Sequence, residues 1–205
     1  RVNGLPRYDK PPLVYWLMGF GYSLPKQELW DPLGTWCARL PSALSSIVMM
    51  LVLGDTVMRW PQKGDLSPRR TGLAIALAFA LSPLVMIWSR VAVSDALLCG
   101  TLGVSLLLHW RRYVNPTGRN WWIAWFVLGL AVLAKGPVAV VITLMVLGGF
   151  SFLQDDFVRL CQRIELRRGI LITAAVSLPW YLAELAVEGK PFWDSFFGYH
   201  NLQRF

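Results

Sequence analysis

Six long apolar runs constrain the fold of this 205-residue chain more than any other feature. A helix that crosses a lipid bilayer needs about 20 mostly apolar residues, with a range of roughly 17–25. Hydrophobic residues make up 55% of the chain and charged residues only 16%, which argues against a soluble domain. The pattern therefore predicts an all-α, polytopic membrane protein. Its six predicted spans cover residues 40–58, 71–88, 96–110, 121–134, 136–153 and 169–187.

A further apolar run at residues 13–24 is too short to span, because 12 helical residues extend only about 18 Å. Its aromatic residues, such as Trp16, are typical of the headgroup region, so we expect an interfacial helix. Pro41 is expected in the first turn of the first span, where proline is tolerated. The chain is thus expected to be part of one transmembrane domain. Its outer loop covers residues 1–38, its six spans 39–187, and the start of the next outer loop 188–205.

The basic residues predict how the spans are oriented. Lys and Arg concentrate in alternate loops, and the positive-inside rule makes those loops cytoplasmic. The segment before residue 40, the turns near Asp95 and Lys135, and the tail after residue 187 then lie on the outer face. The net charge of +8 does not indicate a nucleic-acid partner, because the basic residues follow the loops. The cytoplasmic set comprises Arg59, Lys63, Arg69, Arg70, Arg111, Arg112, Arg119, Arg159, Arg163, Arg167 and Arg168.

Asp9 and Lys10 precede two prolines at the start of the first apolar run. Proline fixes its own φ and moves the residue before it out of the helical region, so Lys10, Pro11 and Pro12 are expected to be extended. The two charged side chains would then be held at the mouth of the membrane domain. The alternative is a charged connector, stiffened by proline, between membrane elements.

Lys135 is a second candidate, because the span that precedes it is short. Residues 121–134 extend only about 21 Å as a helix, against a hydrocarbon core of roughly 30 Å. The turn Lys135-Gly136-Pro137 is therefore expected below the outer surface, in a recess where an ionisable residue is a candidate functional group. The alternative is that Lys135 extends to the lipid headgroups.

Asp95 is a third candidate with three interpretations. Ser94 or Asp95 would cap the next helix, Asp95 would pair with Arg90, or Asp95 would take part in chemistry on the outer face.

Six short motifs in order carry a resemblance to a known family. The chain resembles the bacterial lipid-linked sugar transferases of the protein O-mannosyltransferase and aminoarabinose transferase family, along nearly its whole length. The motifs are Asp-Lys-Pro-Pro-Leu-x-Tyr-Trp (9–16), Arg-Leu-Pro-Ser-Ala (39–43), Ser-Arg-x-x-x-x-Asp (89–95), Gly-Leu-Ala-Val-Leu-Ala-Lys-Gly-Pro (129–137), Pro-Trp-Tyr (179–181) and His-Asn-Leu-Gln-Arg-Phe (200–205).

The resemblance implies a GT-C transmembrane helix bundle with interfacial helices in its first outer loop. It implies an enzyme of the bacterial inner membrane that moves a sugar from a polyprenyl-phosphate donor to a lipid, glycan or protein acceptor on the outer face, with inversion. The usual catalytic carboxylate of the family follows a span that would precede Arg1. The chain is therefore expected to be a fragment that lacks that span and a C-terminal part.

The resemblance also assigns residues. Asp9 and Lys10 match the acidic residue and the lysine of the first motif, and Asp95 and Lys135 match their counterparts in the next two outer turns. The catalytic candidates are Asp9, Lys10 and Asp95. In the aminoarabinose enzymes the residue at Asp9 is a glutamate that helps to hold a metal ion. A divalent metal held by Asp9 and His200 is the corresponding candidate, although Arg204-Phe205 aligns Asn201, one residue later, with the metal-binding histidine.

Physical chemistry gives the cations a role. A polyprenyl phosphate gains negative charge as it leaves the sugar, and fixed cations in a low-dielectric recess stabilise that charge. Lys10, Lys135 and Arg204 are the candidate donor-phosphate ligands, with Arg204 suited to a bidentate contact. The rival interpretations are a transporter or channel, and a non-catalytic membrane scaffold. The apolar centres of the spans, with charges gathered on one face, favour the transferase.

Overall fold

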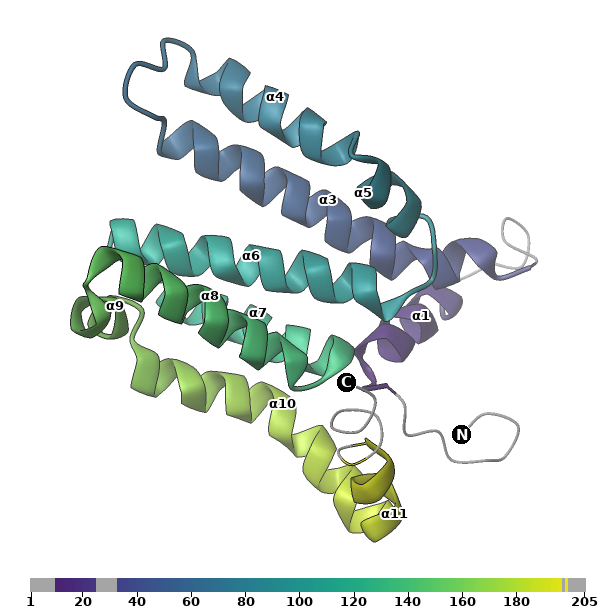
Figure 1. The fold of residues 1–205 in the computed structure, drawn as a ribbon. Helices are drawn as coiled ribbons and strands as arrows, with labels where there is room; N and C mark the ends of the chain where they lie inside the picture. The colour runs from purple at the N-terminus through teal and green to yellow at the C-terminus, as the bar shows by residue number, and fades with distance from the viewer. Residues whose placement is uncertain (1–9, 25–32, 197, 199–205) are drawn as a thin grey trace.

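A computed structural model describes residues 10–24, 33–196 and 198, and the regular structure in these residues is helical throughout. The longest helices, α3, α6 and α10, lie with α7 and α8 in a bundle (Figure 1). The helices are α1 (Leu13–Tyr22), α3 (Thr35–Arg59), α4 (Pro68–Ala80), α5 (Pro83–Trp88), α6 (Ser94–Val114), α7 (Trp121–Lys135), α8 (Val138–Gln154), α9 (Phe157–Arg163), α10 (Leu166–Glu188) and α11 (Lys190–Trp193).

Five of the six predicted spans are single helices, and the remaining one, the second in chain order, is broken. The run at residues 71–88 forms α4 and α5, because Ser82 is extended (φ −58°, ψ 128°) before Pro83 and ends the helical path. By length and composition, α3 and α10 are each sufficient to cross a membrane. Helices α7 and α8 are apolar but shorter, with 15 and 17 residues.

Two expectations about prolines were wrong. Helix α3 begins at Thr35, so Pro41 lies inside the helix instead of in its first turn. Pro12 precedes α1 in the right-handed helical region (φ −82°, ψ −18°) and is not extended. The reason is that a proline restricts the residue before it, and Pro12 is followed by Leu13. Helix α1 occupies most of the expected interfacial run, while its placement at a membrane surface stays a prediction.

Small residues make the helix crossings. Gly100 of α6 lies so close to α3 that a Cβ built on it would be 2.7–2.9 Å from the Cβ, carbonyl oxygen and carbonyl carbon of Ser45. A Cβ built on Gly72 of α4 would likewise lie 2.8 Å from the Gly54 carbonyl oxygen of α3. Lipid tails are as apolar as leucine, so membrane helices associate through close packing and hydrogen bonds at such small residues.

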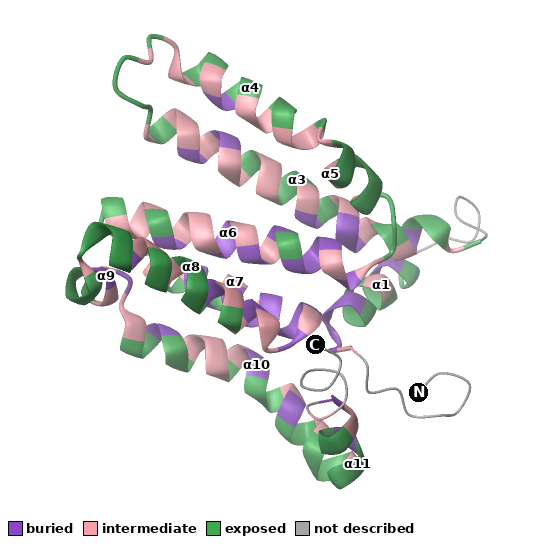
Figure 2. Ribbon diagram, viewed as in Figure 1, coloured by how far each residue is buried: buried purple, intermediate pink, exposed green. Residues whose placement is uncertain are grey.

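Burial is also distributed as in a membrane protein. Figure 2 shows buried positions gathered in α6, α7 and the part of α1 that meets them. Large apolar side chains such as Leu51, Leu144 and Leu171 are 60–69% exposed, whereas Ser42 and Ser105 are fully buried. A bundle that presents leucines outward over long helices is suited to a hydrocarbon environment.

The bundle has two chemically different ends (Figure 1). The loop between α3 and α4, the loop between α6 and α7, and α9 lie at one end, which we call the basic end. Helix α1, the start of α6, the turn after α7, and α11 lie at the other, which we call the motif end. This arrangement follows the predicted alternation of the loops, and the membrane face of each end stays a prediction.

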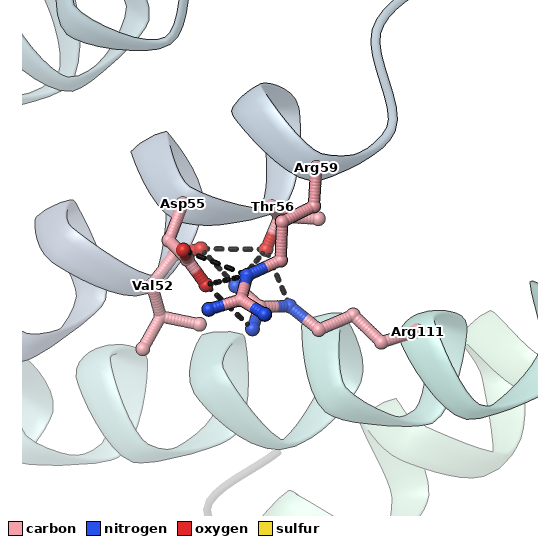
Figure 3. Close-up of polar contacts among 5 residues, drawn as sticks. All are labelled: Val52, Asp55, Thr56, Arg59 and Arg111. Carbon is pink, nitrogen blue, oxygen red and sulfur yellow. Dashed lines mark hydrogen bonds and ion pairs between the residues drawn. The ribbon is translucent and has the colours of Figure 1, made fainter. Parts of the chain in front are cut away.

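A charged clamp joins α3 to α6 at the basic end (Figure 3). The Arg111 guanidinium donates from Nε to the Thr56 hydroxyl at 2.8 Å and from Nη2 to the Val52 carbonyl at 2.7 Å. Its Nη1 lies 2.8 Å from the Asp55 carboxylate, which Arg59 also contacts at 2.8 Å. With its donors occupied and its side chain 18% exposed, Arg111 fixes the register of α6 against α3.

The close approach of α3 and α6 predicts that Gly100→Ala destabilises the full-length protein by about 1–3 kcal/mol, because the new methyl group overlaps the Ser45 backbone. Gly148→Ala in α8 is the matched control, since a Cβ there meets nothing within 4 Å. Thermal unfolding in detergent would compare the two variants. Equal unfolding temperatures for both would contradict the proposed crossing.

Candidate functional site

The candidate site lies at the motif end, where segments distant in sequence meet. Pro11 is fully buried beside half-buried Lys10, and Leu13 shares one apolar cluster with Leu133, at the end of α7. Phe196, just after α11, belongs to the same cluster. One continuous apolar core therefore joins the first and fourth of the sequence motifs to the segment just after α11.

An ion pair lies at this end, between Lys135 and Asp95. The Lys135 ammonium donates a hydrogen bond to the Asp95 carboxylate and joins the end of α7 to the first turn of α6. The two side chains are 39% and 30% exposed, so water reaches both. The ion-pair partner of Asp95 is Lys135 and not Arg90, and the start of α6 at Val93 has no capping side-chain hydrogen bond. A carboxylate in the first turn is also favoured by the helix dipole.

Two serines of α3 hold the backbone on either side of Asp95. The Ser42 hydroxyl donates to the Val93 carbonyl at 3.3 Å, and the Ser45 hydroxyl donates to the Ala96 carbonyl at 3.2 Å. Both serines are buried. The motif at residues 39–43 thus has a structural explanation, because it supplies one of the two hydroxyls that fix the start of α6.

The turn after Lys135 requires glycine. Gly136 has φ +92°, which side-chain-bearing residues rarely adopt, and its amide closes α7 by donating to the Val132 carbonyl at 2.7 Å. A Cβ on Gly136 would also lie 3.1 Å from the Phe196 ring. The Tyr181 hydroxyl donates to the same Val132 carbonyl at 3.2 Å, so the Pro-Trp-Tyr motif of α10 supports this turn.

Two apolar grooves flank the end of α7. One of about 440 Å³ runs between α7, α8 and α10 and includes Val132, Pro137 and Tyr181 in its lining. The other, of about 360 Å³, lies between α1, α3, α6 and α7 and includes Phe20 and Leu97. Both grooves therefore approach the helix ends that carry the ion pair.

The structure brings together Lys10, Asp95 and Lys135 at the motif end. The other predicted site residues, Asp9, His200 and Arg204, lie outside the described residues. No group of three or more His, Cys, Asp or Glu side chains within the described ranges is arranged to hold a metal ion.

Sequence reasoning missed the roles of Ser45, Tyr181 and Phe196. The spacing of Ser42 and Ser45, three residues apart on one helix face, was an available signal, since such residues meet the same neighbouring helix. The packing of Phe196 on the Gly136 turn had no signal in the sequence.

Comparison with known proteins decides the family. Residues 9–182 match the family model described as dolichyl-phosphate-mannose-protein mannosyltransferase. The chain belongs to this family. The fold is accordingly the GT-C helix bundle that the resemblance implied.

Two of the similar proteins in this family are named as aminoarabinose transferases. The undecaprenyl phosphate-alpha-4-amino-4-deoxy-L-arabinose arabinosyl transferase 1 of Pseudomonas fluorescens is 27% identical over 209 residues, which cover 98% of this chain. The similarly named transferase of Pseudomonas aeruginosa is 27% identical over 206 residues, again 98% of this chain. The chain spans 35% of the length of both relatives.

Two crystal structures of ArnT from Cupriavidus metallidurans have the same fold. The apo structure has a TM-score of 0.81 at 27% identity and covers 96% of this chain and 35% of ArnT. The structure bound to undecaprenyl phosphate has a TM-score of 0.81 at 25% identity and covers 99% of this chain and 36% of ArnT.

The pairing of Lys135 with Asp95 predicts energetic coupling between the two residues. In a double-mutant cycle with Asp95→Asn and Lys135→Met, the two single variants should lose more stability together than the double variant, with a coupling of about 1 kcal/mol for a half-exposed pair. Thermal unfolding of the full-length protein at low salt measures this coupling. Strictly additive losses would show that the two charges do not interact.

Proposed function

We propose that this family member is part of a glycosyltransferase that takes a sugar from a polyprenyl-phosphate donor and transfers it to an acceptor on the outer face of a bacterial plasma membrane. The observation that carries the proposal is the Lys135–Asp95 pair, which lies at the same end of the helix bundle as Lys10 and close to two apolar grooves. The likeness to an ArnT structure bound to undecaprenyl phosphate supports the same donor class.

The grooves account for the lipid part of the substrates. A polyprenyl chain is apolar and long, and the groove between α7, α8 and α10 offers an apolar wall that ends at Pro137 and Tyr181, beside the Lys135 turn. A chain lying in this groove would deliver its phosphate to the motif end. The acceptor would be a lipid, a glycan or a protein that approaches the same end.

The cations account for the chemistry. As the bond between the sugar and the phosphate breaks, negative charge accumulates on the phosphate oxygens, and preorganised cations lower the free energy of that transition state. We assign this role to Lys10, Lys135 and Arg204. Lysines act there as point charges, whereas Arg204 would bind two phosphate oxygens through its planar guanidinium.

Asp95 is best assigned as a positioning residue for Lys135. Its carboxylate offsets the ammonium charge while the donor is absent and holds the lysine at the end of α7. An arriving phosphate would compete for the same ammonium, which Asp95 already holds in position at the end of α7 when the donor binds. We assign activation of the acceptor hydroxyl to another carboxylate, because that of Asp95 is engaged by Lys135.

The outer-face location rests on the positive-inside rule, since Lys and Arg concentrate at the basic end. A divalent metal at Asp9 and His200 also stays a prediction, and the role of the cations does not depend on it.

Lys10→Ala and Arg204→Ala are each expected to lower sugar transfer by about 100–1000-fold, because each removes one fixed donor to the leaving phosphate. Lys63→Ala, in the exposed loop at the basic end, is the control and should retain full activity. Transfer from an undecaprenyl-phosphate-linked sugar by the full-length protein in lipid vesicles is the measurement. Turnover near the unaltered rate in both site variants would assign these residues to structure alone.

A further inference from the structure

An amphipathic surface lies at the basic end, away from the candidate site. We call it the α9 surface, and it surrounds the short helix between the membrane helices α8 and α10. Figure 2 shows α9 and the adjacent end of α8 as exposed. Its apolar part is unusually exposed for large side chains: Phe152 85%, Leu153 80%, Phe157 64% and Val158 67%.

Cations border this apolar part. Arg159 and Arg168 have side chains that are 62% and 72% exposed, and each is only loosely paired, with Asp156 at 3.3 Å and Glu165 at 3.6 Å. Arg167 is exposed and makes no ion pair or hydrogen bond with any residue that the structure describes. The α9 surface thus combines apolar side chains with an available guanidinium.

The two kinds of group line one hollow. A groove of about 640 Å³ lies between α9 and the start of α10, and it is lined by Phe157, Val158, Cys161, Gln162, Glu165, Leu166, Arg167 and Arg168. The Glu165 carboxylate in this lining pairs with Arg168, whereas Arg167 is unpaired among the described residues. This volume is in the range of small-molecule sites, roughly 300–1,000 Å³. An apolar wall beside guanidinium groups matches a molecule that is apolar at one end and anionic at the other.

The position of the groove in the fold favours a membrane lipid as this molecule. Helix α8 ends at Gln154 and α10 begins at Leu166, so α9 connects the ends of two apolar helices, and we expect it at the membrane surface. Groups at this level are within reach of lipid headgroups, and basic residues beside apolar ones are the pattern of surfaces that bind anionic lipids.

We propose that the groove between α9 and α10 binds an anionic phospholipid of the membrane leaflet at the basic end. Its phosphate contacts Arg167 and Arg168, and its glycerol and upper acyl carbons pack on Phe157, Val158 and Leu166. The lipid would anchor the α8–α9–α10 connection, and through α10 it would steady the Tyr181 contact at the opposite end. The proposal is independent of the sugar-transfer reaction.

Native mass spectrometry of the full-length protein tests the proposal by measuring affinity for phosphatidylglycerol and phosphatidylcholine after delipidation. Unaltered protein should prefer phosphatidylglycerol. Arg167→Gln should weaken phosphatidylglycerol binding about fivefold, the factor that corresponds to about 1 kcal/mol for one basic residue near an anionic surface. Phe157→Ser should weaken both lipids, and Arg167→Lys should restore much of the preference.

Lys63→Gln is the matched control, because it removes one exposed charge from another loop at the same end. It should leave phosphatidylglycerol affinity unchanged. The proposal is overturned if Arg167→Gln binds phosphatidylglycerol as tightly as unaltered protein, or if Lys63→Gln causes the same loss. It is also overturned if Phe157→Ser lowers the unfolding temperature without changing lipid affinity, which would mean that another protein segment covers the α9 surface.

Discussion

Helix α6 is fixed at both of its ends by polar contacts in an otherwise apolar bundle, and the candidate site depends on this. At the basic end, Arg111 binds the Thr56 hydroxyl, the Val52 carbonyl and the Asp55 carboxylate of α3. At the motif end, Ser42 and Ser45 of α3 bind the carbonyls on either side of Asp95. Lipid tails offer apolar contacts equivalent to those of leucine, so these polar groups, together with the close packing at Gly100, specify the register of α6 against α3.

The end of α7 is fixed in a complementary way. Gly136 makes the turn, and the Tyr181 hydroxyl donates to the Val132 carbonyl that also accepts the Gly136 amide. The Lys135 ammonium reaches the Asp95 carboxylate, whose neighbouring backbone is held by α3. A cation held in this manner loses little further freedom when a phosphate arrives, which is the physical basis of preorganisation. In the proposed function, the apolar groove between α7, α8 and α10, which reaches Pro137, would give a lipid-borne donor a route to it.

The sequence was sufficient for the helical class, for most helix positions and for the separation of basic loops from the charged motifs. These follow from run length, proline chemistry and charge distribution, which are local properties. The break at Ser82-Pro83 was not predicted, because residues 71–88 were interpreted as one apolar span. The signal was nevertheless local, since proline restricts the residue before it.

The contacts across the bundle were not readable in the same way. Within its own segment Asp95 had Arg90 as a reasonable partner, and only the crossing of α6 and α7 brings Lys135 to it. The packing of Phe196 on Gly136 likewise joins segments 60 residues apart, and no periodicity encodes such a contact. Family motifs identified the residues that meet, whereas the helix packing explains why they do.

The central claim is that the motif end receives the donor phosphate, and a structure of the full-length protein bound to undecaprenyl phosphate tests it most directly. The account predicts phosphate density within hydrogen-bond distance of Lys10 and Lys135, with the Lys135 ammonium shared between the phosphate and Asp95. It also predicts polyprenyl density in the groove between α7, α8 and α10. Phosphate bound elsewhere, with Lys135 still paired only to Asp95, would contradict the account.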